Sequence, residues 1–375
     1  MESENLRELS AQNNPHLVHR IAAVALGEKY LILSDWANGH DLKHFWKQTP
    51  KPSVSATLVR DVVAQLTGLA SALKLMHHGY HAGTPSRSAS HSPTLLAIPT
   101  SVAVPVIVSP DAEAGRTPEI VVAGKNLSWR HGDLKPENIL RFYKPGELVG
   151  TLCISDVGLA KRHIVATGFR KDASTTRFAT LAYEPPEAVI RLDAPTSRRY
   201  DIWSFGCIML EFVVWLLYGG EGLETFWKLP VEEKGTLFWS PGDAESRAVV
   251  NRYVTQIMDK VLATNATCQS PSAIGDLLVL VKERVLVPAL SGDNTALLRR
   301  PRIDAAELLK ELQKIENKCE KSEYCYSGPS GHNARLPTVS QWKNTSDTLH
   351  IPLTTHGNGT KNLQVPSGAA MAQRV

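Results

Sequence analysis

Cysteine is scarce in this chain and is not arranged for cross-linking. The 375 residues include five cysteines, which are scattered and form no CxxC pair. Disulfide frameworks and zinc modules need dense or regularly spaced cysteines. The N-terminal region is polar and does not resemble a signal peptide. We therefore expect reduced thiols and an intracellular location, cytoplasmic or nuclear.

An excess of one sign of charge is also missing. Lysine and arginine total 41 against 37 aspartates and glutamates, which gives a formal net charge of +4. No basic stripe with interleaved aromatic residues runs along the chain, although such a stripe is typical of nucleic-acid-binding proteins. We therefore expect no nucleic-acid partner. No pattern in the chain sets an oligomeric state, which the sequence leaves unknown.

One run, Trp203–Tyr218, is apolar enough to be mistaken for a membrane span. It contains Glu211, and it is shorter than the roughly 20 residues that cross a bilayer. A helix that is apolar all round also suits the centre of a large domain. We therefore expect a buried core helix here and no membrane partner.

The stretch His131–Leu140, His-Gly-Asp-Leu-Lys-Pro-Glu-Asn-Ile-Leu, concentrates polar side chains that suit catalysis. Asp133 can accept a proton from a hydroxyl group, and Lys135 can neutralise charge on a transferred group. Asn138 offers an amide oxygen, and oxygen ligands suit Mg²⁺. Taken alone, the stretch is also compatible with a charged surface loop.

Three later segments favour the chemical interpretation. In Leu152–Ala160 an apolar run ends in Asp156 and then Gly158, Thr180–Glu187 contains Tyr-Glu-Pro-Pro-Glu, and Asp201–Gly206 reads Asp-Ile-Trp-Ser-Phe-Gly. In this order the segments resemble the catalytic loop, metal-binding Asp, activation segment and central helix of the eukaryotic protein kinase family. Lys-Pro-Glu-Asn in the first stretch is similar to the serine/threonine kinases. The resemblance covers about residues 1–316.

The resemblance implies a fold and an activity. The fold would be α+β and protein-kinase-like, with a mainly helical large lobe and an incomplete β-sheet in an N-terminally truncated small lobe. The activity would be that of a protein serine/threonine kinase, which transfers the γ-phosphoryl group of ATP to a protein substrate with Mg²⁺. The alternative is a non-catalytic, pseudokinase-like binding or scaffold protein that keeps the large lobe as an interaction surface.

The resemblance also implies the roles of individual residues. Catalytic roles fall to Asp133, Lys135, Asn138 and Thr180, and Mg²⁺ binding falls to Asn138 and Asp156. The implied ATP site comprises the Asp35 carbonyl, the Ala37 N–H, the Asp41 carboxylate beside the ribose, Leu140 under the adenine, and Asp156. Two structural contacts complete the pattern: Glu187 with Arg302, and Asp201 with the backbone N–H groups at His131 and Gly132.

Three features of the family are missing. The printed sequence holds no GxGxxG phosphate loop and no matching strand lysine ahead of the catalytic loop. Gly132 stands where most kinases have Arg. The missing phosphate loop and lysine favour weak or no activity for this chain. His131–Leu134 also resembles the start of the catalytic loop of small-molecule phosphotransferases such as aminoglycoside kinases, but those enzymes lack the Pro-Pro-Glu segment.

We expect the resemblance to organise the chain as follows. Residues 1–34 are a partial small lobe, 35–316 are the large lobe, 79–126 are an irregular Pro-rich insertion, and 317–375 are a disordered tail. Residue periodicity predicts strands at 17–24 and 29–33, and helices at 55–78, 248–263, 274–289 and 305–316.

Overall fold

The computed structural model describes residues 14–26, 29–78, 129–156, 181–190, 197–231, 235–242, 248–269, 271–289, 301–326 and 336. The chain divides into two units, Met1–Pro337 and Thr338–Val375, and every described residue lies in the first. The expected insertion at 79–126 lies outside the described residues, as does most of the expected tail.

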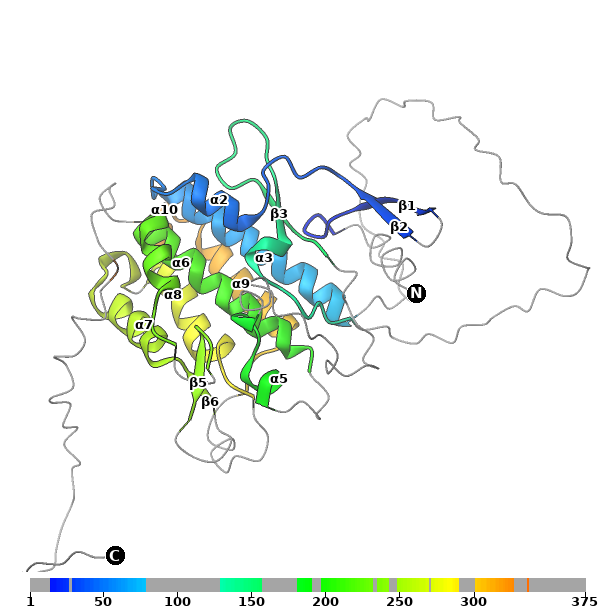
Figure 1. Ribbon diagram of the computed structural model, residues 1–375. Coiled ribbons are helices and arrows are strands. Elements are labelled where there is room, and N and C mark those ends of the chain that lie inside the picture. The colour runs from blue at the N-terminus through cyan, green and yellow to red at the C-terminus, as the bar shows by residue number, and fades with distance from the viewer. Residues whose placement is uncertain are drawn as a thin grey trace, which may run out of the picture. The chain divides into compact units, whose positions relative to one another are not determined.

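The described chain begins with an antiparallel hairpin (Figure 1). Strand β1 (Arg20–Leu26) pairs with β2 (Lys29–Ser34), and Val24 lies opposite Leu31. This confirms the predicted hairpin. Alternate residues of a strand share a face, so Val24, Leu31 and Leu33 lie together, and each is 44–50% exposed. Within the described residues the sheet of the small lobe consists of these two strands, and its apolar face is left uncovered there.

A mainly helical large lobe follows the hairpin, as expected. Its helices are α2 (Leu42–Gln48), α3 (Ala56–His78), α5 (Pro186–Ile190), α6 (Arg199–Trp227), α7 (Arg252–Thr264), α8 (Ala273–Leu280), α9 (Ala305–Lys318) and α10 (Ser322–Cys325), with short turns η1 (Pro136–Asn138), η3 (Ala266–Cys268) and η4 (Val281–Val285). Two further strand pairs join β3 (Ile139–Phe142) to β4 (Thr151–Ile154) and β5 (Trp239–Pro241) to β6 (Ala248–Val250).

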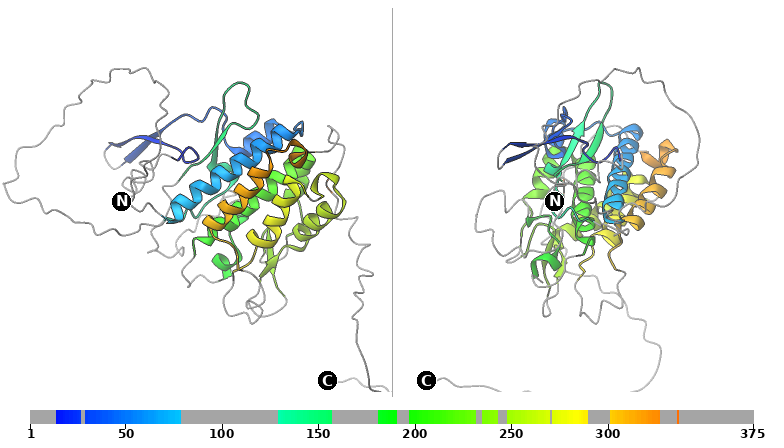
Figure 2. Two further views of the ribbon diagram at one scale, coloured as in Figure 1. Left: turned by 180° about the vertical axis from the view of Figure 1, so that it is seen from behind. Right: turned by 90° about the vertical axis from the view of Figure 1, so that its right-hand side faces the viewer.

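Helices α3 and α9 pack side by side, and α8 lies against α9 (Figure 2). The apolar side chains of α3 recur at three- and four-residue steps and are buried, as the sequence predicts. Asp304 caps α9 by accepting from the N–H groups of Ala306 and Glu307, while the Glu307 side chain reaches back to the Asp304 N–H. This reciprocal capping fixes where α9 begins.

Helix α6 forms the centre of the large lobe. Among the described helices, α6 is long and apolar enough to span a membrane, but 94% of its most apolar 18-residue stretch is buried inside the protein. Trp203, Phe205 and Phe212 are each fully buried. The run Trp203–Tyr218 is therefore the core helix that the sequence predicts.

Two predicted helix boundaries are wrong. The helix expected from Ala248 begins at Arg252, because residues Ala248–Val250 pair with β5 instead. Asn251 then caps α7 through its side chain, which accepts from the Tyr253 N–H. The helix expected over 274–289 runs as α8 only to Leu280 and continues as the single π-helical turn η4.

The predicted start of the tail at residue 317 is also too early. Helix α9 continues to Lys318, and α10 follows. Cys319, Tyr324 and Cys325 are buried, and Arg60 Nε of α3 donates to the Cys319 carbonyl at 2.8 Å. The residues after α9 pack on the lobe because they bury apolar surface there.

Glu211 is an ionisable side chain in the middle of α6. It is fully buried, and the Tyr183 hydroxyl and Trp227 Nε1 donate to its Oε1 at 2.8 and 2.7 Å. Burial raises the pKa of Glu211 to about 8, although both hydrogen bonds favour the charged form. The group is therefore mostly neutral at pH 7.

Glu211→Gln should make the free energy of unfolding less dependent on pH. The pKa of Glu211 is about 8 in the fold, against an ordinary value of 4.5. Its contribution is fully present below the ordinary pKa and is lost as pH rises through 8. Across this window the wild type should lose roughly 3–5 kcal/mol relative to the Gln variant. Urea unfolding at several pH values measures this, and parallel pH profiles would contradict it.

Candidate active site

A buried carboxylate holds the loop that carries the expected site. Asp201, at the start of α6, is fully buried and accepts from the N–H groups of His131 and Gly132 at 2.8 and 2.9 Å. His77 Nε2 lies 2.8 Å from the same carboxylate. Burial alone would raise the pKa of Asp201, but the hydrogen bond from His77 holds it below its ordinary value. The predicted Asp201 contacts are confirmed.

The His131 ring joins this loop to the end of β4. Its Nδ1 accepts from the Asp133 N–H at 3.2 Å, and its Nε2 lies 2.7 Å from the Ser155 carbonyl. The two contacts assign the ring proton to Nε2. Gly132 follows with a φ of 78°, a conformation that strains residues with a side chain. Glycine in place of the family's Arg therefore suits the backbone of this loop.

Three predicted catalytic side chains converge after this turn. Lys135 Nζ lies 3.0 Å from Asp133 Oδ2, and Asn138 Nδ2 donates to the Asp133 carbonyl at 2.7 Å and to Oδ2 at 3.2 Å. The Asp133 and Lys135 side chains keep 18% and 14% exposure. A carboxylate, an ammonium group and an amide therefore lie within hydrogen-bonding distance of one another, and the first two keep partial exposure. The structure brings these residues together, and their roles stay predictions.

The β3–β4 ladder places the two predicted metal ligands at one end. Asn138 immediately precedes β3, and Ser155 and Asp156 follow β4. Because the strands are antiparallel, these positions meet: the Ser155 N–H and hydroxyl both donate to the Asn138 carbonyl at 2.9 Å. Asp156 is exposed and has a φ of 56°, which is uncommon outside glycine.

The predicted hinge connects β2 to α2 and lies against β3. The Gly39 N–H donates to the Arg141 carbonyl, and the Arg141 N–H donates to the His40 carbonyl. This pairing brings Leu140 next to Asp41. The Asp41 carboxylate accepts from the His44 N–H at 2.8 Å and caps α2. The cap explains Asp41 structurally, and the ribose contact stays a prediction.

The backbone groups predicted to bind adenine belong to the same hinge. Within the part of the chain that the structure describes, the Asp35 carbonyl and the Ala37 N–H have no hydrogen-bond partner. Thr180, the remaining predicted catalytic residue, lies outside the described residues. The hinge therefore keeps both predicted backbone groups available, while the position of Thr180 is not described.

The predicted pair of Glu187 and Arg302 is confirmed. Arg302 is fully buried, and its guanidinium contacts both Glu187 oxygens, at 2.6 and 3.2 Å. It also donates to the carbonyls of Val287 and Arg199. The pair ties α5 to the start of α6 and to the chain just before α9.

The sequence did not predict the polar side-chain contacts that lie beside the Asp133 loop. Lys43 of α2 pairs with Glu137 at 2.6 Å, and Tyr183 bonds to Glu211. The signal was the presence of Glu211 in an apolar run, because a buried polar group needs hydrogen-bond partners. The identity of those partners was not visible in sequence spacing.

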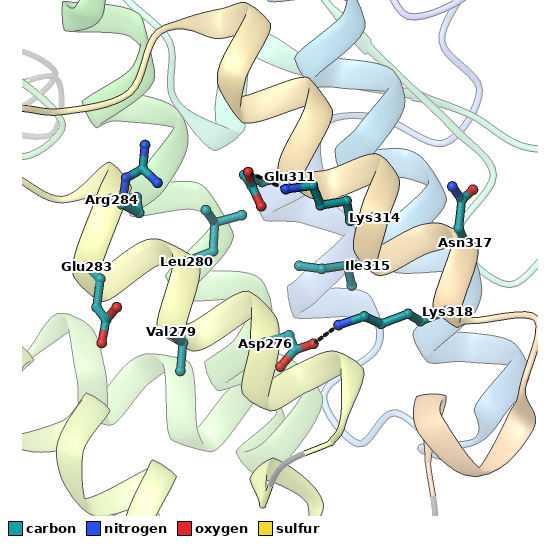
Figure 3. Close-up of a pocket in the computed structure, with 10 residues that line it drawn as sticks. All are labelled: Asp276, Val279, Leu280, Glu283, Arg284, Glu311, Lys314, Ile315, Asn317 and Lys318. Carbon is teal, nitrogen blue, oxygen red and sulfur yellow. Dashed lines mark hydrogen bonds and ion pairs between the residues drawn. The ribbon is translucent and has the colours of Figure 1, made fainter.

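A cavity of about 500 Å³ lies between α8 and α9 (Figure 3). Four of its charged side chains pair with each other: Lys314 with Glu311, and Lys318 with Asp276. None of its lining residues belongs to the predicted site. This cavity is therefore separate from the predicted reaction site.

The arrangement can be compared with known proteins. Residues 126–265, which include the Asp133 loop, Asp156 and Asp201, match the family model of the protein kinase domain. Over these residues the chain is similar to the eukaryotic protein kinase family. The matched segment contains the Asp133 loop, the β3–β4 ladder and the buried core helix α6, whose Asp201 accepts from the His131 N–H of the loop.

Three kinases illustrate the similarity. A probable cell division protein kinase of Encephalitozoon cuniculi is 34% identical over 138 residues, covering 36% of this chain and 48% of that protein. A serine/threonine-protein kinase MPS1 of the same organism is 36% identical over 83 residues, covering 22% of this chain and 13% of that protein. Cyclin-dependent kinase 17 of Caenorhabditis elegans is 32% identical over 114 residues, covering 30% and 14%. The chain thus spans about half the length of the first and less of the others.

Asp201→Ala should destabilise the large lobe by about 3–5 kcal/mol, because it removes the acceptor for His77 and for two loop N–H groups. The matched control is Asp259→Ala, which breaks the ion pair of a half-exposed carboxylate with Lys282. Exposed pairs contribute up to about 1 kcal/mol. Urea unfolding gives both values, and equal losses for the two variants would show that Asp201 does not anchor the loop.

Proposed function

We propose that this chain binds Mg²⁺·ATP and transfers the γ-phosphoryl group to a serine or threonine hydroxyl of a protein. The observation that carries this proposal is the convergence of Asp133, Lys135 and Asn138, with Lys135 Nζ 3.0 Å and Asn138 Nδ2 3.2 Å from the Asp133 carboxylate. The match of residues 126–265 to the protein kinase domain supports the reaction class. The names of relatives such as the MPS1 serine/threonine kinase support the acceptor class.

Each residue would have a distinct role. Asp133 would accept the proton as the hydroxyl oxygen attacks the γ-phosphorus and the bond to the bridging phosphate oxygen breaks. Lys135 would neutralise negative charge on the transferred group. The reaction would leave a phosphorylated protein and ADP, with the proton on Asp133.

The donor set fits a magnesium ion. Asn138 uses its Nδ2 group to hold Asp133, and among the described residues no group donates to its amide oxygen. Asp156 supplies an exposed carboxylate at the same end of the ladder. Hard cations such as Mg²⁺ prefer oxygen ligands of this kind. Mg²⁺, when bound, would neutralise charge on the phosphate groups of ATP.

The proposal extends to location and partners. The five cysteines are free, buried thiols, which supports an intracellular protein in the cytoplasm or nucleus. Burial raises the pKa of Cys153 to about 12, so this thiol is not activated for redox chemistry. The partner would be a protein substrate.

A non-catalytic, pseudokinase-like binding or scaffold role is the second candidate. The printed sequence holds no Gly-rich loop, and the described small lobe is the hairpin β1–β2. In this case the large lobe would serve as a binding surface. The two candidates share Mg²⁺·ATP binding only if the hinge and Asp156 suffice to hold the nucleotide.

Mg²⁺·ATP should bind the purified chain, and Asp156→Ala should weaken binding at least about tenfold because a metal ligand is lost. Calorimetry and thermal shift, with and without Mg²⁺, measure this. Asp259→Ala, which removes an acidic side chain on α7, is the matched control and should bind Mg²⁺·ATP as the wild type does. Equal binding by the Asp156 variant would contradict the assigned role, and absence of binding by the wild type would overturn the enzymatic proposal.

Asp133→Asn should abolish phosphoryl transfer while leaving nucleotide binding intact. Loss of a general base lowers rates by about 10²–10⁴-fold, whereas the amide preserves shape. Transfer of labelled phosphate to a mixture of serine- and threonine-containing peptides gives the rate, and calorimetry gives the affinity. A variant that retained the wild-type rate would exclude Asp133 as the base. Nucleotide binding by a wild type that shows no transfer would favour the second candidate.

A further inference from the structure

Helix α2 packs beside β3 (Figure 1), and a cavity of about 370 Å³ opens where the two elements meet. Three basic side chains line it: Arg141 from β3, His40 from the hinge and His44 from α2. We call these three residues the Arg141 site. Among the described residues that line the cavity, none belongs to the predicted ATP site or to the predicted catalytic set.

The side chain of Arg141 is held in one orientation. Its Cζ lies 4.6 Å from the centre of the Phe45 ring and 4.3 Å from that of the Tyr143 ring. Its Nε donates to the Val149 carbonyl at 2.5 Å. A Cβ atom at Gly39 would lie only 2.7 Å from Arg141 Cγ, so glycine is needed there to make room for this side chain. The guanidinium is therefore positioned before any ligand arrives, which lowers the entropy cost of binding.

The Arg141 guanidinium has no carboxylate partner. Within the part of the chain that the structure describes, its terminal N–H groups make no hydrogen bond or ion pair. Glu147 and Asp61 act on it at longer range, and each accepts from a backbone N–H instead, that of Lys144 or Val149. Partial burial lowers the pKa of Arg141 below its ordinary value, because the charged form loses hydration. A bound anion would offset this cost.

The two histidines of the site lie against each other. The ring centres of His40 and His44 are 4.2 Å apart. His40 has a φ of 60°, a left-handed conformation that is uncommon outside glycine. Strained backbone of this kind is concentrated at functional sites. Two imidazole rings this close repel each other when both are charged, and an anion beside them removes that repulsion.

We propose that the Arg141 site binds a phosphoryl group. Such a group presents three strong acceptor oxygens, and it therefore suits donors that approach from several directions. The guanidinium fork can donate two parallel N–H bonds, and the imidazoles add donors from the hinge and from α2. A carboxylate offers two oxygens in one plane and uses fewer of these donors.

The Arg141 site is joined to the hinge through the backbone. The Gly39 N–H donates to the Arg141 carbonyl, and the Arg141 N–H donates to the His40 carbonyl. A phosphoryl group at this site contacts none of the residues assigned to phosphoryl transfer. The inference therefore does not rest on the proposed function.

Peptide binding to the full-length chain, measured without nucleotide, tests the proposal. The probe is a fluorescein-labelled short peptide of glycine and alanine with one central phosphoserine. Two partner peptides carry serine or glutamate at the same position, and fluorescence anisotropy gives the three affinities. The phosphoserine peptide should bind at least about tenfold more tightly than the serine peptide and about threefold more tightly than the glutamate peptide.

Substitutions assign the binding to the Arg141 site. Arg141→Lys keeps the charge but loses the fork, and it should weaken binding of the phosphoserine peptide about tenfold. His40→Asn removes a ring while asparagine tolerates the left-handed backbone, and it should weaken binding about threefold. The matched control is Arg60→Lys on α3, where Nε also donates to a backbone carbonyl, that of Cys319. It should bind as the wild type does, and urea unfolding checks that each variant is folded.

Competition with inorganic phosphate identifies the source of the group. Displacement of the peptide by inorganic phosphate of equal Kd would support a site for free phosphate. A Kd at least about tenfold weaker would support a phosphorylated protein as the ligand. Equal binding of the phosphoserine peptide and either partner would overturn the proposal. Unchanged affinity in folded Arg141→Lys or His40→Asn, or an equal loss in Arg60→Lys, would also overturn it.

Discussion

The buried carboxylate of Asp201 is the interaction on which the functional loop depends. A charge in a fully buried position is tolerated only when fixed donors surround it. Here those donors are the backbone N–H groups at His131 and Gly132, together with His77 from α3. The buried charge at the start of the core helix is thus stabilised by backbone N–H groups of the loop. The same contacts hold the loop backbone from which the side chains of Asp133, Lys135 and Asn138 project.

Helix α6 provides further attachments along its length. The Ser204 hydroxyl donates to the Tyr183 carbonyl at 2.8 Å, and the Tyr183 hydroxyl reaches Glu211. Arg302 lies over the Trp203 ring while it pairs with Glu187. The part of α6 before its kink at Gly219 therefore holds the Asp133 loop, the segment before α5 and the chain that leads to α9. Such shared support keeps parts of a site in fixed geometry.

Much of the site could be predicted because its residues lie in short, contiguous motifs. Asp133, Lys135 and Asn138 are close in sequence, so their meeting needs only one turn of backbone. The Asp201 contacts and the Glu187–Arg302 pair followed from the family resemblance, and the structure confirms both. Prediction was weaker at helix ends: Ala248–Val250 form a strand, since pairing with the nearby strand Trp239–Pro241 overrode a local helical pattern.

By itself, the sequence determined the order of the motifs, the core helix, the hairpin and the main helices, because these follow from local periodicity and contiguous polar residues. Beyond the contacts that the family resemblance implied, only the tertiary structure decided which groups meet from distant positions. It joined Lys43 to Glu137, Trp227 to Glu211 and His131 to Ser155. Such contacts depend on how helices and strands pack against each other. Packing depends on the shapes of many side chains together, which no local pattern encodes.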